Sequence, residues 1–336
     1  MQTKSKYFYN ARLVKEVESG PGGVIRVLTG DELSGLDDAS LVEMDLKAKG
    51  VLKPLWHPNA EKIGYCTQGE LMVSIHGPDG SEQFSVKPGE IFYIPQGLIH
   101  HIHNASESES VVRFALNNAK PETMMLSSAV DATSDAALHS TFGVSSDIAQ
   151  SLKKTKNHEL IGTCENLILG NHVSAHRYKF DIENSVKAIS AAGGYLQVGL
   201  KVNLTALNGV GILGFGLNPG GAVEPHWHPN SGEIVYITKG RIRGMVLSPD
   251  RHLETQEVGA GEGFFAPAGH FHSIENIGDG SVEGIAFFNN AESSYVGLGE
   301  ALGAFSDEVL ASTFGLKAAD LKKVNKPGGP LVVVPT

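Results

Sequence analysis

The chain repeats itself once, and this repeat limits the folds that are open to it. The segment PLWHPNAEKIGYCTQG at residues 54–69 parallels PHWHPNSGEIVYITKG at residues 225–240, an offset of 171. Residues 89–104 parallel residues 261–276 at an offset of 172, and the sequence STFG at residues 140–143 recurs 172 positions later. An offset that stays nearly constant over so long a stretch indicates the duplication of a whole domain.

Length and composition fit two ordinary domains rich in turns. The chain has 336 residues, with 40 glycines and 15 prolines, and such a supply of turn residues is typical of all-β proteins. We therefore predict a first domain at residues 1–155, a linker at residues 156–175 and a second domain at residues 176–336. The apolar tail at residues 330–334 is expected to pair with an existing sheet.

The second copy of the repeat carries side chains suited to a metal. His226 and His228 are two positions apart, so on a strand they point to the same side. The turn sequence PNSG at residues 229–232 lets the chain reverse and bring Glu233 back on an adjacent strand. Two imidazoles and one carboxylate suit a divalent transition metal and leave positions open for substrate or O2. The simpler alternative is that these are ordinary strand histidines satisfied by neighbours or solvent.

Two spacing patterns carry a resemblance to a known family. The pattern G(x)5HxH(x)4E(x)6G fits residues 220–240, and G(x)5PxGxxH(x)3N fits residues 261–276. These are both halves of the cupin signature, so the chain resembles a bicupin. The resemblance implies an all-β fold with minor helices, made of two tandem cupin (double-stranded β-helix, jelly-roll) barrels. It also implies a metal in the second barrel, held by His226, His228, Glu233 and His272.

The first copy departs from this ligand set. The positions that match the four expected ligands hold Leu55, His57, Lys62 and His100. An ammonium cannot coordinate and repels a cation, so we expect no metal in the first barrel. One alternative is a small-anion pocket built from Lys62 and the two histidines. The other is a vestigial site, in which Lys62 reaches solvent or a surface carboxylate.

Among two-domain cupins, the chain looks most like the group of oxalate decarboxylases, germins and seed storage globulins. The HWHPN and PxGxxH motifs and the helical segments after each barrel, near residues 134–152 and 306–323, carry this resemblance. It implies one divalent ion per chain, with manganese expected and iron or zinc as alternatives, and a small carboxylate as substrate. It also implies a homo-oligomer, a trimer or hexamer, joined through these helices. The alternative role for the helices is to cap the barrel end of their own chain.

Several positions depart from the oxalate decarboxylases within this resemblance. Those enzymes carry an arginine three residues before the first motif histidine, where this chain has Val223. For their acidic lid residue the nearest candidate is Glu292, and His270 is a second candidate for proton transfer, with a rim position at the barrel mouth as its alternative. Arg241 or Arg243 either replaces the missing cation or lies on the surface.

Three functions are therefore compared. The first is a metal-dependent decarboxylase or oxidase that acts on a small carboxylate in the second barrel. The second is a non-catalytic bicupin of the storage or spherulin type, which predicts a packed interior with no room at the metal. The third is a quercetinase-type dioxygenase, which predicts a wide apolar mouth to which Phe264, Phe265 and Phe271 contribute, unless they are ordinary core residues.

Other classes of partner are disfavoured by composition. The formal net charge of −10 and the lack of a Lys/Arg block argue against nucleic acid. No apolar run approaches the roughly 18 residues of a membrane span, so no membrane partner is expected. The N-terminal sequence lacks the apolar core of a signal peptide, which predicts a cytoplasmic protein. The two cysteines, Cys66 and Cys164, give no disulfide framework.

Overall fold

The computed structural model describes residues 5–154, 159–165 and 176–336. These residues group into two units. The N-terminal barrel comprises Val14–Leu28 and Ser40–Asp181, and the C-terminal barrel comprises Met1–Leu13, Thr29–Ala39 and Ile182–Thr336. The predicted linker at residues 156–175 lies outside the described residues except for residues 159–165.

The N-terminal barrel consists of two antiparallel sheets. Its strands are β2 (Glu16–Gly20), β3 (Gly23–Leu28), β4 (Ser40–Leu46), β5 (Gly50–Trp56), β6 (Lys62–Gln68), β7 (Leu71–Gly77), β8 (Gly80–Val86), β9 (Glu90–Ile94), β10 (Ile99–Asn104), β11 (Ser110–Leu116), β12 (Met124–Met125), β13 (Ile161–Thr163) and β14 (Lys179–Asp181). One sheet runs β14-β9-β6-β11-β4-β3-β2. The other runs β12-β5-β10-β7-β8, with β13 also paired to β5.

The C-terminal barrel repeats this plan. Its strands are β1 (Phe8–Asn10), β15 (Lys187–Ala191), β16 (Gly194–Gly199), β17 (Gly211–Leu217), β18 (Gly221–Trp227), β19 (Glu233–Lys239), β20 (Arg241–Leu247), β21 (Leu253–Gly259), β22 (Glu262–Ala266), β23 (Phe271–Asn276), β24 (Val282–Phe288), β25 (Val296–Gly297) and β26 (Val333–Pro335). One sheet runs β1-β22-β19-β24-β17-β16-β15 and the other β21-β20-β23-β18-β25, with β26 also on β18. The predicted pairing of the tail is thus confirmed, as is the predicted fold of two mostly-β domains with few helices.

One strand of each barrel comes from an unexpected part of the chain. β1 lies near the N-terminus yet pairs with β22 of the C-terminal barrel, where Phe8 is opposite Phe264. β14 precedes the second repeat yet pairs with β9 of the N-terminal barrel. The predicted domain ranges place β1 in the first domain, 1–155, and β14 in the second, 176–336. In the structure β1 belongs to the C-terminal barrel and β14 to the N-terminal barrel. The difference arises because sequence position does not determine which sheet edge a short strand joins.

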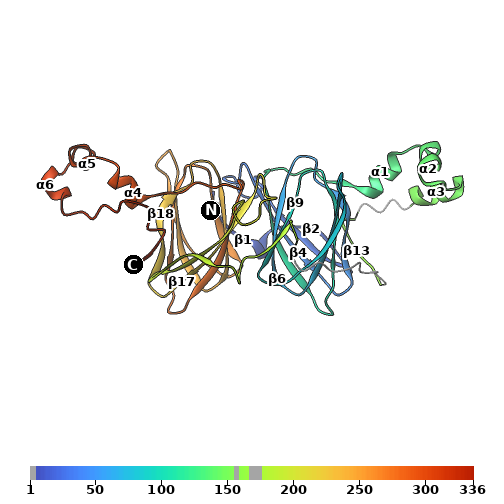
Figure 1. The fold of residues 1–336 in the computed structure, drawn as a ribbon, viewed down its shortest axis with the longest axis horizontal. Coiled ribbons are helices and arrows are strands. Elements are labelled where there is room, and N and C mark those ends of the chain that lie inside the picture. Colours follow the sequence, from blue (N-terminus) through green and yellow to red (C-terminus); the bar gives the residue numbers. More distant parts are fainter. Residues whose placement is uncertain (1–4, 155–158, 166–175) are drawn as a thin grey trace. The chain divides into compact units, whose positions relative to one another are not determined.

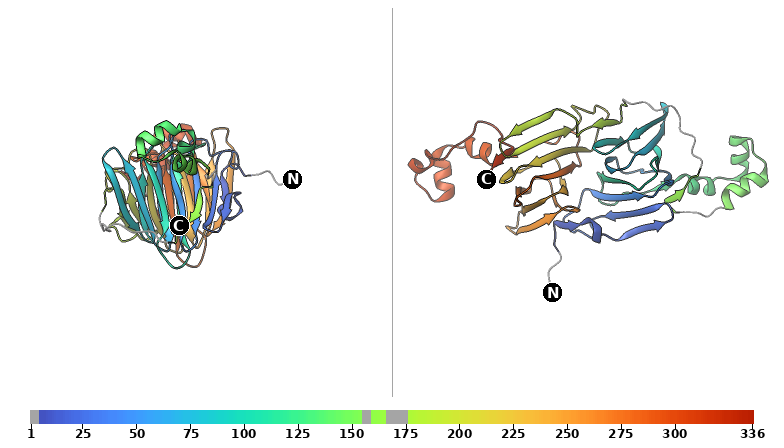
Figure 2. Two further views of the ribbon diagram at one scale, coloured as in Figure 1. Left: turned by 90° about the vertical axis from the view of Figure 1, so that its right-hand side faces the viewer. Right: turned by 90° about the horizontal axis from the view of Figure 1, so that it is seen from below.

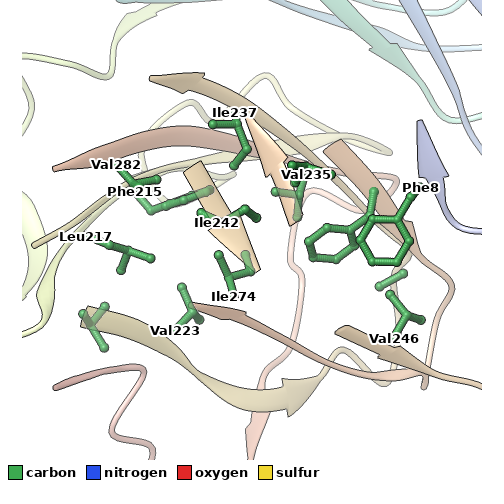
Figure 3. Packing of buried hydrophobic residues seen from close by; sticks show 14 of the residues in the cluster. Phe8, Phe215, Leu217, Val223, Val235, Ile237, Ile242, Val246, Ile274 and Val282 are labelled. Atoms are coloured by element: carbon green, nitrogen blue, oxygen red, sulfur yellow. The ribbon is translucent and has the colours of Figure 1, made fainter. Parts of the chain in front are cut away.

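Strand alternation builds the core of the C-terminal barrel. Along β20, Ile242, Gly244 and Val246 are buried, whereas Arg241 and Arg243, at the alternate positions, are exposed. Apolar side chains from the two facing sheets fill the interior, as Figure 3 shows for Val223 and Ile274 of one sheet and Phe215 of the other. A metal site on the inward face of this barrel is therefore enclosed by aliphatic and aromatic groups.

Helices follow each barrel, as expected. In the N-terminal unit these are α1 (Leu126–Ala132), α2 (Asp135–Phe142) and α3 (Ser146–Lys154); in the C-terminal unit they are α4 (Leu298–Gly303), α5 (Asp307–Phe314) and α6 (Ala318–Leu321). The helices lie outside the strand layers (Figures 1 and 2). The Ser134 and Ser306 side chains cap α2 and α5 by accepting a backbone N–H three residues on. A short 3-10 helix, η1 (Ala11–Leu13), follows β1. None of the described helices is long and apolar enough to span a bilayer.

Candidate metal centre

Four buried side chains meet inside the C-terminal barrel. His226 lies on β18, His228 follows that strand, Glu233 begins β19 and His272 lies on β23. β18 and β23 are paired so that His226 is opposite His272, and a register shift between Val223 and His226 separates this pair from the rest of the ladder. The structure therefore brings together the four residues that the motif spacing selected.

Backbone carbonyls fix the tautomer of all three histidines. The Nδ1 atoms of His226, His228 and His272 lie 2.6, 2.7 and 2.8 Å from the carbonyl oxygens of Glu224, Ser294 and His270, respectively. A carbonyl oxygen only accepts, so each Nδ1 must carry the proton. Each neutral ring therefore presents the lone pair of Nε2, which is how an outer hydrogen bond orients a metal-binding histidine.

These lone pairs face one carboxylate oxygen. Glu233 Oε2 lies 2.7, 3.1 and 3.8 Å from the Nε2 atoms of His272, His228 and His226. The four ligand atoms all lie within 4.8 Å of one another. Neighbouring ligands at right angles on one ion, with bonds of about 2.1 Å, are about 3 Å apart. Lone pairs and a carboxylate oxygen this close repel unless a cation lies among them, so the donor set fits a divalent metal.

The protonation states of the site also suit a metal. Burial alone would raise the pKa of Glu233, but the three imidazoles that face its carboxylate oxygen outweigh burial and hold this pKa well below its usual range. Burial lowers the pKa of His226 to about 4. A metal binds a carboxylate and neutral imidazoles, and these two pKa shifts favour those forms for Glu233 and His226.

Sequence reasoning missed a second buried carboxylate, Glu224, behind His226. It accepts four hydrogen bonds, from the backbone N–H groups of Gly299, Leu331 and Val332 and from the hydroxyl of Tyr295. The Tyr295 ring in turn stacks on His226, with centroids 4.6 Å apart. Glu224 thus ties the start of α4 and the C-terminal tail to a metal ligand. A carboxylate in the apolar strand sequence GAVEPHW was the one signal that could have drawn attention to it.

A cavity of about 30 Å³ lies beside the ligands. His226, His228 and Glu233 form one wall, and Tyr295 together with aliphatic and aromatic side chains forms the rest. This volume holds about two water-sized groups. The metal site is therefore neither sealed by packing nor open to a large substrate.

His270 and Glu292, the two predicted proton-transfer residues, lie near the site without pointing into it. The His270 carbonyl accepts from His272, while its imidazole packs edge-on against Tyr7 with centroids 5.9 Å apart. The Glu292 side chain is 75% exposed, and its carboxylate lies 4.0 Å from the Lys201 ammonium. From the same loop, Ser294 contacts His228 instead.

Two further sequence alternatives are resolved by burial. Arg241 and Arg243 lie on the outer face of β20, where both pair with Glu257, so neither replaces the missing cation. Phe264 and Phe265 are fully buried, which makes them core residues.

The equivalent positions of the N-terminal barrel form a different site. His57 Nδ1 lies 2.9 Å from the Glu122 carbonyl oxygen, and His100 Nδ1 lies 3.1 Å from that of Leu98, so these rings keep the same tautomer as their counterparts. The Nε2 atom of His100 is buried and has no hydrogen-bond partner among the described residues. Leu55 is buried where the second barrel has His226.

Lys62 turns inward in this barrel. The residue is only 5% exposed, and its Nζ lies 4.1 Å from the centre of the Phe114 ring. The expectation that Lys62 reaches solvent or a surface carboxylate is therefore wrong. No ion pair of Lys62 is found within the described parts of the chain. Burial accordingly lowers its pKa to about 7. The histidine, cysteine, aspartate and glutamate side chains of the described ranges form one group able to hold an ion, the one in the C-terminal barrel.

Curated relatives match either most of this chain or less than half of it. OxdC of Bacillus subtilis (strain 168), an oxalate decarboxylase, is 26% identical over 310 residues, which cover 90% of this chain and 79% of that protein. Germin-like protein 5-1 of Oryza sativa subsp. japonica is 29% identical over 157 residues, 43% of this chain and 71% of its own. Oxalate oxidase 1 of Hordeum vulgare is 29% identical over 123 residues, 34% of this chain and 61% of its own.

Solved structures show the same fold over the full length. The structure of oxalate decarboxylase from Bacillus subtilis at pH 4.6 covers 100% of this chain and 89% of its own, with a TM-score of 0.84 and 22% identity. A second structure of that enzyme, described by its Mn(II) centres, has a TM-score of 0.84 and 21% identity, with 100% of this chain and 90% of its own covered. At these identities, the likeness establishes the fold.

The cupin family model matches this chain twice, at residues 10–150 and at residues 182–322. Each match covers most of the strands of one barrel, and the second contains the whole His3Glu group. The chain therefore belongs to the cupin family, as a bicupin related to oxalate decarboxylases and germins, with one His3Glu metal site in its C-terminal barrel.

Proposed function

We propose that the C-terminal barrel is the active site of a metal-dependent enzyme that acts on a small carboxylate. The observation that carries this proposal is the cavity of about 30 Å³ directly beside His226, His228 and Glu233. Four protein ligands leave two positions of an octahedral ion free, and a small carboxylate or O2 fits the space that faces them. The relatives named as oxalate decarboxylase and oxalate oxidase support this substrate class.

Manganese is the proposed ion, with iron and zinc as alternatives. The support is the related oxalate decarboxylase structure described by its Mn(II) centres. Such an ion supplies Lewis-acid polarisation of a bound carboxylate and, for manganese or iron, a redox centre. The chain itself orients the three Nε2 atoms through backbone carbonyls, keeps Glu233 ionised and surrounds the free positions with apolar groups that limit water.

The size of the cavity argues against the two other functions. A non-catalytic storage-type bicupin predicts a packed interior with no room at the metal, yet space is present. A quercetinase-type enzyme needs a wide apolar mouth for an aromatic substrate, whereas Phe264 and Phe265 are buried core residues. A substrate of a few non-hydrogen atoms fits the space best.

Proton transfer in this proposal is assigned to Glu292, with His270 as the second candidate. Glu292 lies on the loop whose Ser294 carbonyl accepts from His228, so an inward turn of this loop carries the carboxylate toward the cavity. His270 is joined to His272 through its own backbone carbonyl. Either residue would supply a proton to the carbon released by decarboxylation.

We also propose that the chain forms a trimer or hexamer through its helices. Large apolar side chains are exposed on them: Phe142, Ile148 and Leu152 in the N-terminal unit, and Leu298, Val309 and Phe314 in the C-terminal unit. Apolar patches of this kind mark association surfaces. Contact between copies would bury these side chains.

The proposed function is tested on the purified protein in two steps. Elemental analysis of protein made with manganese, iron and zinc available should find one ion per chain. Release of CO2 from oxalate should then be detected and be abolished in His228→Ala, while His252→Ala, an exposed histidine outside the site, retains it. Absence of any bound metal would refute the proposal.

A further inference from the structure

The cavity beside the metal ligands has an unusual lining for a site that binds a dianion. Beyond the ligands and Tyr295, the walls are Leu196, Leu213, Phe215, Val223, Ile274 and Val332, with Ala286 completing them. These side chains come from both sheets of the barrel and from the C-terminal tail. The part of a bound molecule that extends from the ion into the cavity is therefore surrounded by hydrocarbon on every side except toward Tyr295.

No cationic side chain of the described residues lines the cavity to pair with a charge at the far end of a bound ligand. Arg241 and Arg243 of β20 point outward and pair with Glu257. The hydroxyl of Tyr295 already donates to Glu224 at 3.3 Å. A second carboxylate placed in the cavity would be desolvated without a donor, whereas a methyl group would gain from burial.

We propose that this site selects a small monocarboxylate, of the size of acetate or propionate, whose carboxylate binds the ion and whose carbon end fills the apolar cavity. This inference rests on the proposed function, since the ion anchors the substrate. Space for about two water-sized groups accommodates one or two carbon groups beyond the carboxylate. Each buried methylene is expected to raise affinity about fourfold.

The test measures binding to the manganese-loaded full-length chain, not turnover. Formate, acetate, propionate and oxalate are titrated while the electron paramagnetic resonance and water-proton relaxation of the bound Mn(II) are recorded. Manganese content is measured before and after each titration, so that metal removed by oxalate is not counted as binding. The expected affinity rises from formate to acetate to propionate by about fourfold per step, and oxalate binds at least tenfold more weakly than propionate.

Substitution of Val223 provides the matched comparison, because its side chain lines the cavity. Val223→Arg should reverse the order and favour oxalate, whereas Val223→Met, of similar length and without charge, should keep the preference for propionate. Tighter binding of oxalate than of propionate by the unmodified chain would overturn this inference while leaving the metal enzyme intact. If the chain binds no metal, the proposed function fails and this inference fails with it.

Discussion

Lys62 and Glu233 hold the same place in the two barrels, with opposite charge. Lys62 begins β6 and lies opposite Leu116 of β11 and Ile94 of β9. Glu233 begins β19 and lies opposite Phe288 of β24 and Ala266 of β22. A common backbone register thus supports a metal ligand in one barrel and a buried ammonium in the other.

Restoring the lost ligands should therefore create a second metal site. In the double variant Leu55→His/Lys62→Glu, the N-terminal barrel regains three imidazoles and a carboxylate at positions with the same strand register. Elemental analysis is expected to show an increase from one to two ions per chain. Lys62→Met, which removes the ammonium without adding ligands, should stay at one ion. Two ions in the unmodified protein would contradict this account.

The buried Lys62 should make stability depend on pH. Burial lowers its pKa from 10.5 to about 7, so between these values the unfolded chain binds more protons than the folded chain, and stability increases as pH rises through this window. Within the window, each pH unit contributes up to about 1.4 kcal/mol. The reference is the variant Lys62→Met, which lacks this contribution. The two proteins are compared above pH 7, because His57 has a pKa of about 4 and stays neutral there. From pH 7 to pH 9 the free energy of unfolding should rise by about 2 to 3 kcal/mol relative to the variant. Parallel pH profiles in urea denaturation would show that Lys62 is not buried.

Replacing Glu224 by glutamine should weaken both the fold and the metal site. An amide NH2 would then face backbone N–H groups of Leu331, Val332 or Gly299, and these donors would lose their acceptor. We expect a loss of about 2 kcal/mol in unfolding free energy and of about tenfold in manganese affinity, as for other outer partners of metal ligands. Glu283→Gln, an exposed surface carboxylate, should change neither value. Unchanged metal affinity in Glu224→Gln would show that the residue acts on the tail alone.

Glu292→Gln tests the proposed proton donor. If the loop turns inward during turnover, removal of the acid should reduce kcat by about 100-fold or more, because the amide keeps the shape but gives no proton. Metal content should stay at one ion per chain, since Glu292 is exposed and makes no contact with the ligands among the described contacts. Glu257→Gln on β21 serves as the surface control. Full activity in Glu292→Gln would transfer the role to His270, whose alanine variant should then lose turnover.

Polar substitutions on the helices test the proposed oligomer. Phe142→Ser combined with Phe314→Ser removes two exposed aromatic rings, one from each set of helices. Light scattering after size exclusion should show the trimer or hexamer reduced to smaller species, with circular dichroism unchanged. Leu13→Ser changes an even more exposed apolar residue, which lies in η1 and not in the helices that follow the barrels, and should leave the mass unchanged. A monomeric unmodified chain would contradict the proposal directly.

Three of the four ligands were predictable because their determinants are local, and the fourth, His272, was expected from the cupin resemblance. Strand alternation places His226 and His228 on one side, and the turn at residues 229–232 limits where Glu233 can go. The internal repeat then added the two-barrel architecture. Residue spacing along the chain was thus enough to predict that these side chains converge.

The partners of Glu224 were not predictable in this way. Its donors Gly299 and Val332 lie 75 and 108 positions further along the chain, so only the folded sheets bring them together. The burial of Lys62 was equally hidden, because a lysine at the start of a strand is usually solvent-exposed. Periodicity shows which face a residue takes, but it does not show what fills the space opposite.

The exchange of β1 and β14 means that no single cut can divide this chain into two complete barrels. Any break between the repeats leaves β1 on the N-terminal fragment, away from β22, whose sheet edge it completes in the C-terminal barrel. A break before Lys179 also leaves β14 on the C-terminal fragment, away from β9 of the N-terminal barrel. The second repeat, which carries the metal ligands, can therefore not be excised by one cut with all of its strands.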